Sequence, residues 1–243
     1  MTEIWLREAV ALSGLPPPTT FPRDIARDAG RRLPVTLVVV DGLTSASVRD
    51  WLSRRMGLDH PVSDTPRRFR GCMVACSGRG VLFRDSNDSE DHQRFTLAHE
   101  VAHFVLDHLT PRARALKRYG EAIRTVLDED RPPHPRERLA FALDQVPLGI
   151  QVKLMERDAD GAIQSGSVAE AEWRADRLAF ELLAPADIAS PLLKERHDDP
   201  GDVRLAGRFG LPRIHARTYV RMLTRRERLR SYSTVDFLGD AGR

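Results

Sequence analysis

Apolar residues recur along this chain with two different periods, and these periods predict a mixture of helices and strands. Spacings of three and four predict amphipathic helices, whereas short apolar runs bounded by turn residues predict strands. The predicted helices cover residues 22–32, 45–56, 95–109, 112–128, 136–145 and 168–185, with two more within 202–223. The predicted strands cover residues 35–40, 70–76, 80–84 and 150–155, of which the first is expected to be buried. Turns are predicted at 77–79, where they close a hairpin, and at 158–161.

Composition places the chain among ordinary globular proteins. Its 243 residues are 41% hydrophobic and 30% charged, which suits one sizeable core with a small appendage. The net charge of +3 and the pI of about 9.2 permit acidic partners without requiring them. No stretch resembles a signal peptide, and the longest apolar run, near 37–40, is too short to span a bilayer. A cytoplasmic location without a membrane partner is therefore expected.

The segment His99-Glu100-Val101-Ala102-His103 carries the clearest chemical signal. On a helix, His99 and His103 project from one face, so that both imidazoles can bind a single Zn²⁺. Glu100 lies beside this face and is the predicted catalytic base, acting on a water molecule at the metal. The motif predicts a zinc peptidase, although Mn²⁺ or another divalent ion can also bind such a set of ligands.

A zinc site of this type needs a third protein ligand. One class of peptidase continues its motif with Gly-x-x-His, but Leu106 and Leu109 stand at those positions and exclude that class. The ligand is then expected from a separate helix, where Glu172 and Asp176 share one stripe. Glu172 is the predicted ligand, and Asp176 is predicted to accept a hydrogen bond from the other ring nitrogen of His99.

Several further side chains are candidates for supporting roles. Asp107 lies on the face of His99 one turn beyond the motif, where it serves as a helix-end group or as support for a ligand. Tyr119 and His92 are the candidates for stabilising the transition state.

Two segments together resemble the ImmA/IrrE-type metallopeptidases. Residues 94–103 read RFTLAHEVAH, and residues 172–185 combine a glutamate with an Ala-Asp pair and a closing Leu-Leu-Ala-Pro. The resemblance extends over about residues 68–225. Leu178 stands where the family usually has Phe, and the connection from His103 to Glu172 is longer than is typical.

This resemblance implies a fold, an activity and a substrate. The fold would be α+β: a small zincin-like (gluzincin) catalytic domain with a short mixed or antiparallel sheet and two metal-bearing helices. The activity would be that of a zinc-dependent endopeptidase. Its substrate would be a helix-turn-helix repressor encoded nearby, cut to release a stress, phage or mobile-element response. In peptidases of similar build an extended substrate pairs with a sheet edge, and either hairpin strand could provide that edge.

The predicted organisation is a zincin-like domain at 1–199 and a helix-turn-helix-like segment at 200–243. Residues 110–166 form an insertion between the two motifs. It could cover the active-site cleft or select substrates, but an inert surface elaboration is favoured. Within the C-terminal segment, Arg213 and Arg217 are candidates for nucleic-acid contact, but packing of the helices on the catalytic domain is favoured. Two alternatives to the peptidase remain open: a DNA-binding or protein-binding regulator with a structural or degenerate zinc site, and the toxin of a toxin-antitoxin pair.

Overall fold

A four-stranded mixed sheet lies at the centre of the computed structural model, which describes residues 4–57, 68–156, 166–195 and 197–238. The strands are β1 (Val35–Val40), β2 (Phe69–Cys76), β3 (Arg79–Asp85) and β4 (Gln151–Glu156), in the spatial order β1-β3-β2-β4. β1 is parallel to β3, whereas β2 is antiparallel to both β3 and β4. The α+β class implied by the resemblance is confirmed, and the sheet, expected to be mixed or antiparallel, is mixed. The turn predicted at 158–161 lies outside the described residues.

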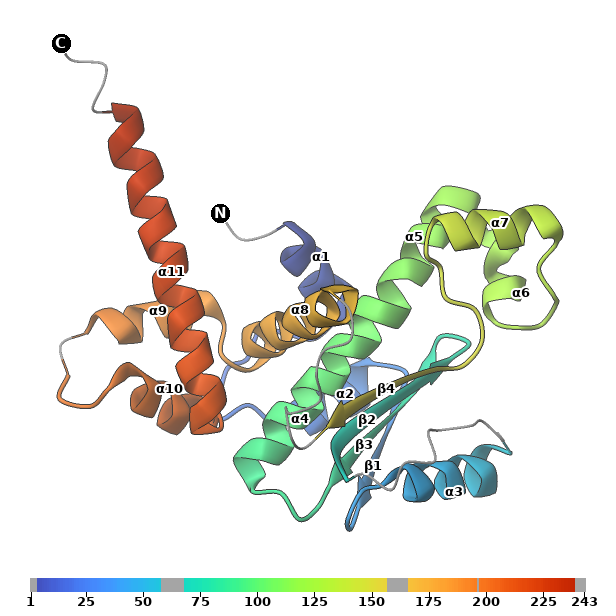
Figure 1. Ribbon diagram of the computed structural model, residues 1–243, viewed down its shortest axis with the longest axis horizontal. Coiled ribbons are helices and arrows are strands. Elements are labelled where there is room, and N and C mark those ends of the chain that lie inside the picture. The colour runs from blue at the N-terminus through green and yellow to red at the C-terminus, as the bar shows by residue number, and fades with distance from the viewer. Residues whose placement is uncertain (1–3, 58–67, 157–165, 196, 239–243) are drawn as a thin grey trace.

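Helices cover both faces of the sheet (Figure 1). They are α1 (Ile4–Ser13), α2 (Ile25–Arg32), α3 (Ser45–Met56), α4 (Glu90–His103), α5 (Thr110–Tyr119), α6 (Arg124–Leu127), α7 (Pro135–Leu143), α8 (Gly166–Leu183), α9 (Ala186–Lys194), α10 (Gly201–Phe209) and α11 (Arg213–Leu238). A π-helical segment at Phe104–Leu109 joins α4 to α5, and a 3-10 turn at Glu121–Ile123 precedes α6. α3 lies on one face of the sheet, α4 runs across the other, and α8 crosses α4.

The alternation of side chains along β2 builds a core on each face of the sheet. Met73 and Ala75 join the larger core, which contains α4 and α8, whereas Cys72 and Val74 join the smaller core beneath α3. Because both faces are covered, β2 is apolar almost without interruption. The strand therefore fixes α4, and with it the histidine motif, against a rigid support.

Several predicted boundaries are wrong for identifiable reasons. The helix expected at 112–128 is interrupted because Gly120, with φ of +84°, ends α5. The helix expected to end at residue 109 instead continues through the π-helical segment into α5. β1 is only half-buried, with Val39 52% exposed, because it lies at the edge of the sheet. The sequence patterns did not predict α1 and α9.

The hairpin strands do not provide a free edge, contrary to the expectation from the sequence. β4 pairs with β2 and β1 pairs with β3, so both hairpin strands are internal. Among the described strands, the free edges belong to β1 and β4. Of these two edge strands, β4 contacts α4, the helix that carries the histidine motif, and β4 comes from the segment 110–166.

The C-terminal helices share the main core. Tyr219 of α11 stacks on Phe180 of α8 with ring centroids 4.5 Å apart, and its hydroxyl donates a hydrogen bond to the carbonyl of Ala184 at 2.7 Å. This is the packing favoured from the sequence. By contrast, α5, α6 and α7 enclose a small core of their own around Phe141. None of the described helices combines the length and apolar character needed to cross a membrane.

Candidate metal centre

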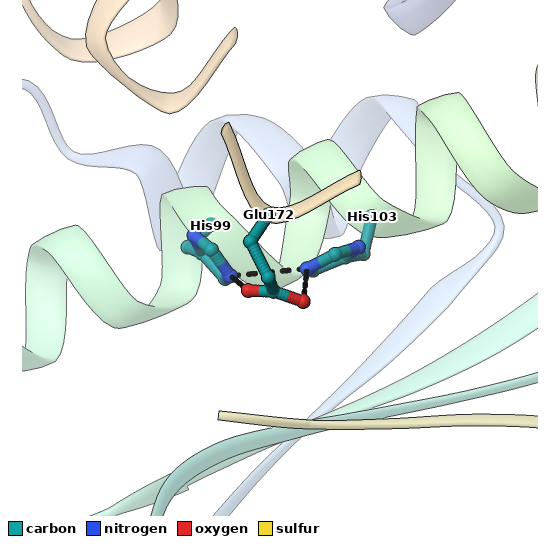
Figure 2. Close-up of side chains that lie close together, drawn as sticks. All are labelled: His99, His103 and Glu172. Atoms are coloured by element: carbon teal, nitrogen blue, oxygen red, sulfur yellow. Dashed lines mark hydrogen bonds and ion pairs between the residues drawn. The ribbon is translucent and has the colours of Figure 1, made fainter. Parts of the chain in front are cut away.

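Two helices bring three potential metal ligands together. His99 and His103 project from α4 toward α8, where Glu172 faces them (Figure 2). The Nε2 atoms of the two histidines are 3.0 Å apart. The carboxylate oxygens of Glu172 lie 3.2 Å from Nε2 of His99 and 3.3 Å from Nε2 of His103. Both imidazoles are buried, whereas Glu172 is partly exposed.

These separations fit a metal ion. Ligand atoms at the usual Zn–N and Zn–O distances of a tetrahedral site lie about 3.3 Å from one another. The three separations around His99, His103 and Glu172 are close to that value without any rearrangement. Two imidazoles and one carboxylate also match the ligand types of catalytic zinc sites, which leave one position open.

Hydrogen bonds on the far side of each imidazole strengthen this fit. Nδ1 of His99 lies 2.9 Å from Asp176, the contact anticipated from the sequence, and Nδ1 of His103 lies 2.8 Å from Asp107. Because a carboxylate accepts hydrogen bonds, each neutral ring carries its proton on Nδ1 and directs the Nε2 lone pair at its neighbours. Three electron-pair donors then converge on one point, an arrangement that requires a cation.

The pKa values of the metal-free cluster also indicate that positive charge is needed between these side chains. Burial lowers the pKa of His99, but its hydrogen bonds to Asp176 and Glu172 outweigh burial and raise that pKa to about 10. Burial also raises the pKa of Glu172, yet hydrogen bonds to His103 and His99 bring it well below its usual value. Without a metal, protons therefore provide the positive charge that the cluster needs.

Glu100 is the buried acid beside this cluster. Its side chain is fully buried, and within the described residues neither carboxylate oxygen has a hydrogen-bond partner. Burial raises the pKa of Glu100 to about 7, against the opposing influence of His99 and His103. A carboxyl group with a pKa near neutrality can accept and release a proton at physiological pH, which suits a general base.

Replacing Glu100 with Gln should stabilise the metal-free protein at pH 8. The pKa of Glu100 is about 7 in the folded protein, whereas a glutamate in the unfolded chain has a pKa of about 4.5. The protonated form therefore favours folding below pH 4.5, and this contribution is lost as the pH rises through 7. Gln has the shape of the neutral acid at every pH. We expect a gain of up to about 3 kcal/mol in the free energy of unfolding at pH 8 and little change at pH 4.5. Urea denaturation after removal of metals measures both, and equal effects at the two pH values would contradict the prediction.

Gly71 of β2 makes room for Glu100. A Cβ atom at this position would lie 2.5 Å from Cγ2 of Thr96 and 2.6 Å from Oε1 of Glu100, both closer than real Cβ contacts. The strand therefore approaches α4 more closely than any side chain permits. A glycine at position 71 is therefore needed for Glu100 to occupy its buried position on α4.

Replacing Gly71 with Ala should destabilise the protein by about 1–3 kcal/mol, as overpacked cores usually do. The added methyl must displace Thr96 and Glu100 or separate β2 from α4. Thermal and urea denaturation measure the loss. Gly207→Ala is a suitable control because a Cβ atom there, in the last turn of α10, meets nothing within 4 Å. If both variants are as stable as the wild type, Gly71 has no packing role.

The structure separates the two candidates for transition-state stabilisation. Tyr119 ends α5 some four turns after His103, where its hydroxyl donates a hydrogen bond to Asp144 and its ring packs on Phe141. At a rise of about 1.5 Å per residue, it lies too far along the helix to reach the cluster. Tyr119 is therefore not part of the site. His92 lies on α4 two turns before His99, and its Nδ1 is 3.2 Å from the Arg70 guanidinium.

The two C-terminal arginines are engaged with an acidic neighbour. Arg213 and Arg217 lie 3.0 Å and 3.6 Å from the same carboxylate oxygen of Asp202 on α10. Both side chains are exposed, and the shared partner offsets part of their charge.

Sequence reasoning missed three features of the site. Gly71 and Arg70 belong to a strand whose approach to α4 is a tertiary property. His215 of α11 stacks on Phe95 beside the cluster, although the sequence around it shows no partner. Asp107, by contrast, was already a candidate for support, and its i,i+4 spacing places it within reach of His103.

Comparison with protein families matches residues 52–143 to Peptidase_M78, described as the IrrE N-terminal-like domain. The matched segment contains the motif from His99 to His103 and ends before Glu172. No curated protein matches the chain significantly.

Proposed function

We propose that this chain, whose residues 52–143 match the IrrE N-terminal-like domain of Peptidase_M78, is a zinc-dependent endopeptidase of the ImmA/IrrE type. The observation that carries the proposal is the convergence of three electron-pair donors, from His99, His103 and Glu172, beside a buried acid. Neither the regulator with a structural zinc site nor a degenerate site explains a fully buried Glu100 that has no hydrogen-bond partner among the described residues.

Each residue has a distinct role in this mechanism. When bound by His99, His103 and Glu172, zinc supplies a Lewis acid that polarises the scissile carbonyl and acidifies water. Glu100 accepts the proton of the attacking water and later delivers it to the leaving amine. Asp176 and Asp107 hold the two imidazoles in the tautomer that leaves Nε2 free for the metal.

An extended substrate is proposed to pair with β4. In the antiparallel register Met155 lies opposite Gly71, the residue that faces Glu100, and Lys153 lies opposite Met73. Lys153 also approaches Asp107, the partner of His103, at 3.5 Å. The free edge of β4 therefore runs beside the metal ligands, where the main chain of a peptide can add a further strand.

The proposed substrate is a helix-turn-helix repressor, as the resemblance to the ImmA/IrrE group implies. Its cleavage would release a stress, phage or mobile-element response. Since such a partner is usually encoded nearby, the test is to purify the repressor from the adjacent reading frame and incubate it with zinc-loaded protein. We expect discrete fragments on a denaturing gel, their loss with 1,10-phenanthroline, and recovery when zinc is restored.

Other results would contradict the proposal. A protein that binds one zinc but leaves both the repressor and an unrelated protein such as casein intact is not an endopeptidase, and the regulator then gains support. Cleavage of casein alone would retain the activity but reject the repressor as substrate. Parallel loading with Mn²⁺ identifies which ion supports the faster reaction.

A further inference from the structure

A third histidine lies beside the metal cluster, and the helix-turn-helix-like segment supplies it. His215 of α11 stacks on Phe95 of α4, with ring centroids 3.7 Å apart and ring planes 19° apart. Phe95 precedes His99 by about one helical turn, so the imidazole of His215 lies at the His99 end of the cluster. The charged and titratable groups near enough to influence its pKa are Asp176, His92, His99 and Arg70.

Stacking, rather than hydrogen bonding, holds His215 in place. Within the described part of the chain, neither of its ring nitrogens makes a hydrogen bond to another protein group, and the side chain is half-buried. Burial lowers the pKa of His215 to about 4, so the ring is neutral at pH 7 and offers one N–H donor. An oriented imidazole with a free donor is available to a bound peptide.

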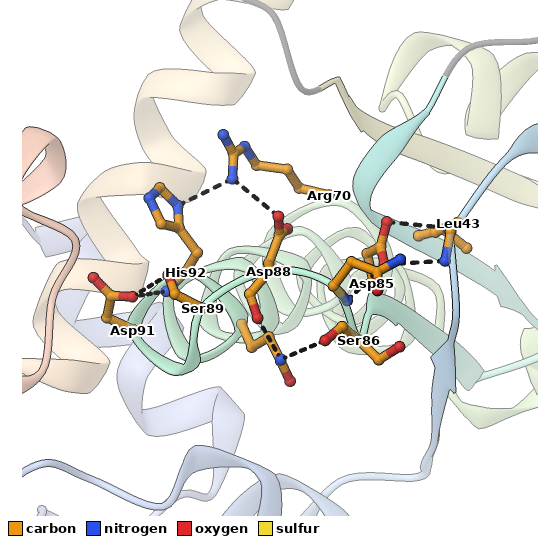
Figure 3. Close-up of polar contacts among 11 residues, drawn as sticks. Leu43, Arg70, Asp85, Ser86, Asp88, Ser89, Asp91 and His92 are labelled. Carbon is orange, nitrogen blue, oxygen red and sulfur yellow. Dashed lines mark hydrogen bonds and ion pairs between the residues drawn. The ribbon is translucent and has the colours of Figure 1, made fainter.

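Two neighbouring side chains offer donors in the same region. Arg70 is the additional residue where the β2–β4 register shifts between Phe69 and Gly71. Bulges of this kind often redirect a side chain beside an active site. Figure 3 shows the guanidinium of Arg70 between Asp88, at 3.4 Å, and Nδ1 of His92, at 3.2 Å.

The contact with Arg70 fixes the tautomer of His92. A guanidinium group only donates hydrogen bonds, so Nδ1 of His92 must accept, and the neutral ring carries its proton on Nε2. The ring centroids of His92 and His215 are 6.2 Å apart, and Arg70 contacts His92. β2, α4 and α11 thus contribute N–H donors close to one another.

We propose that His215, together with His92 and Arg70, forms a substrate-binding subsite that hydrogen-bonds an oxygen atom of the bound peptide. The proposal rests on the peptidase function argued above. Because the subsite presents donors, the oxygen belongs either to a backbone carbonyl or to the carboxylate of an acidic side chain. α11 is then part of the peptidase site, whatever else the helix-turn-helix-like segment binds.

The test measures binding of two peptide hydroxamates to zinc-loaded protein by calorimetry. The probes are identical except that one carries Glu and the other Gln next to the metal-binding group. His215→Phe keeps a ring that can stack on Phe95 but removes the donor, and His215→Gln restores an N–H group. His197→Gln is the control, since His197 is exposed and lies outside the site. Zinc content and thermal unfolding verify each variant, and His215→Ala replaces His215→Phe if the latter does not fold.

We expect His215→Phe to weaken hydroxamate binding roughly three- to tenfold at unchanged zinc content, and more for the Glu probe if a carboxylate is the partner. Gln at position 215 should recover part of the loss. An equal loss for both probes identifies the backbone carbonyl. Unchanged affinity of His215→Phe for both probes overturns the subsite while leaving the peptidase proposal intact. A zinc-loaded wild type that binds neither probe overturns both proposals.

Discussion

Replacing Glu100 with Gln should reduce peptide hydrolysis by about 10²- to 10⁴-fold while leaving the metal in place. Glu100 is not among the three converging donors, so its carboxylate is not needed to hold zinc. Gln keeps the size and shape of the side chain but cannot accept the proton of the attacking water. The measurement combines steady-state cleavage of the repressor with determination of bound zinc.

The control for this variant is Glu170→Gln. Glu170 lies on the exposed surface of α8, off the stripe that carries Glu172, so the same chemical change should leave cleavage and zinc content unchanged. Since Glu100→Gln is also expected to stabilise the metal-free protein at pH 8, unfolding cannot explain a loss of activity. Full activity of Glu100→Gln would assign the base to another residue.

The proximity of His99, His103 and Glu172 was predictable from the sequence because the spacing within each motif is local. Residues four apart on a helix share a face, which placed His103 beside His99 and Asp176 beside Glu172 before any tertiary information was used. To bring Glu172 near the two histidines, one further assumption was needed: that the apolar faces of α4 and α8 pack together. Thus the parts of the site that depend on helical periodicity were predictable.

The remaining parts of the site depend on contacts between distant segments. Gly71 is required because β2 passes within Cβ distance of Glu100, and no pattern within the strand reveals that approach. His215 reaches Phe95 only because α11 folds back onto the main core. Likewise, β4 is an edge strand because it pairs with β2, although α4 and α5 separate the two strands in the sequence. Tyr119 was misplaced because the chain stays helical through residues 104–109 into α5, which carries Tyr119 away from His103.

Replacing Glu172 with Ala should abolish stable zinc binding. The two histidines would remain, but the cluster would lose one of its three donors and its one direct negative charge. Loss of a supporting partner such as Asp176 typically costs 10- to 100-fold in metal affinity, so Asp176→Ala should fall between Glu172→Ala and the wild type. Competition with a fluorescent zinc chelator measures all three affinities, and Glu170→Ala is the matched control on the same helix.

Thermal unfolding provides an independent measure of the same ligand. A metal that binds only the folded protein adds about 4 kcal/mol to the free energy of unfolding when its concentration is 1,000 times the dissociation constant. The wild type should therefore melt at a higher temperature when zinc is added, Asp176→Ala should gain less, and Glu172→Ala should not respond. If Glu172→Ala retains one zinc and the full thermal shift, the third ligand is another group. The packing of α8 on α4 would then stabilise the fold without supplying a metal ligand.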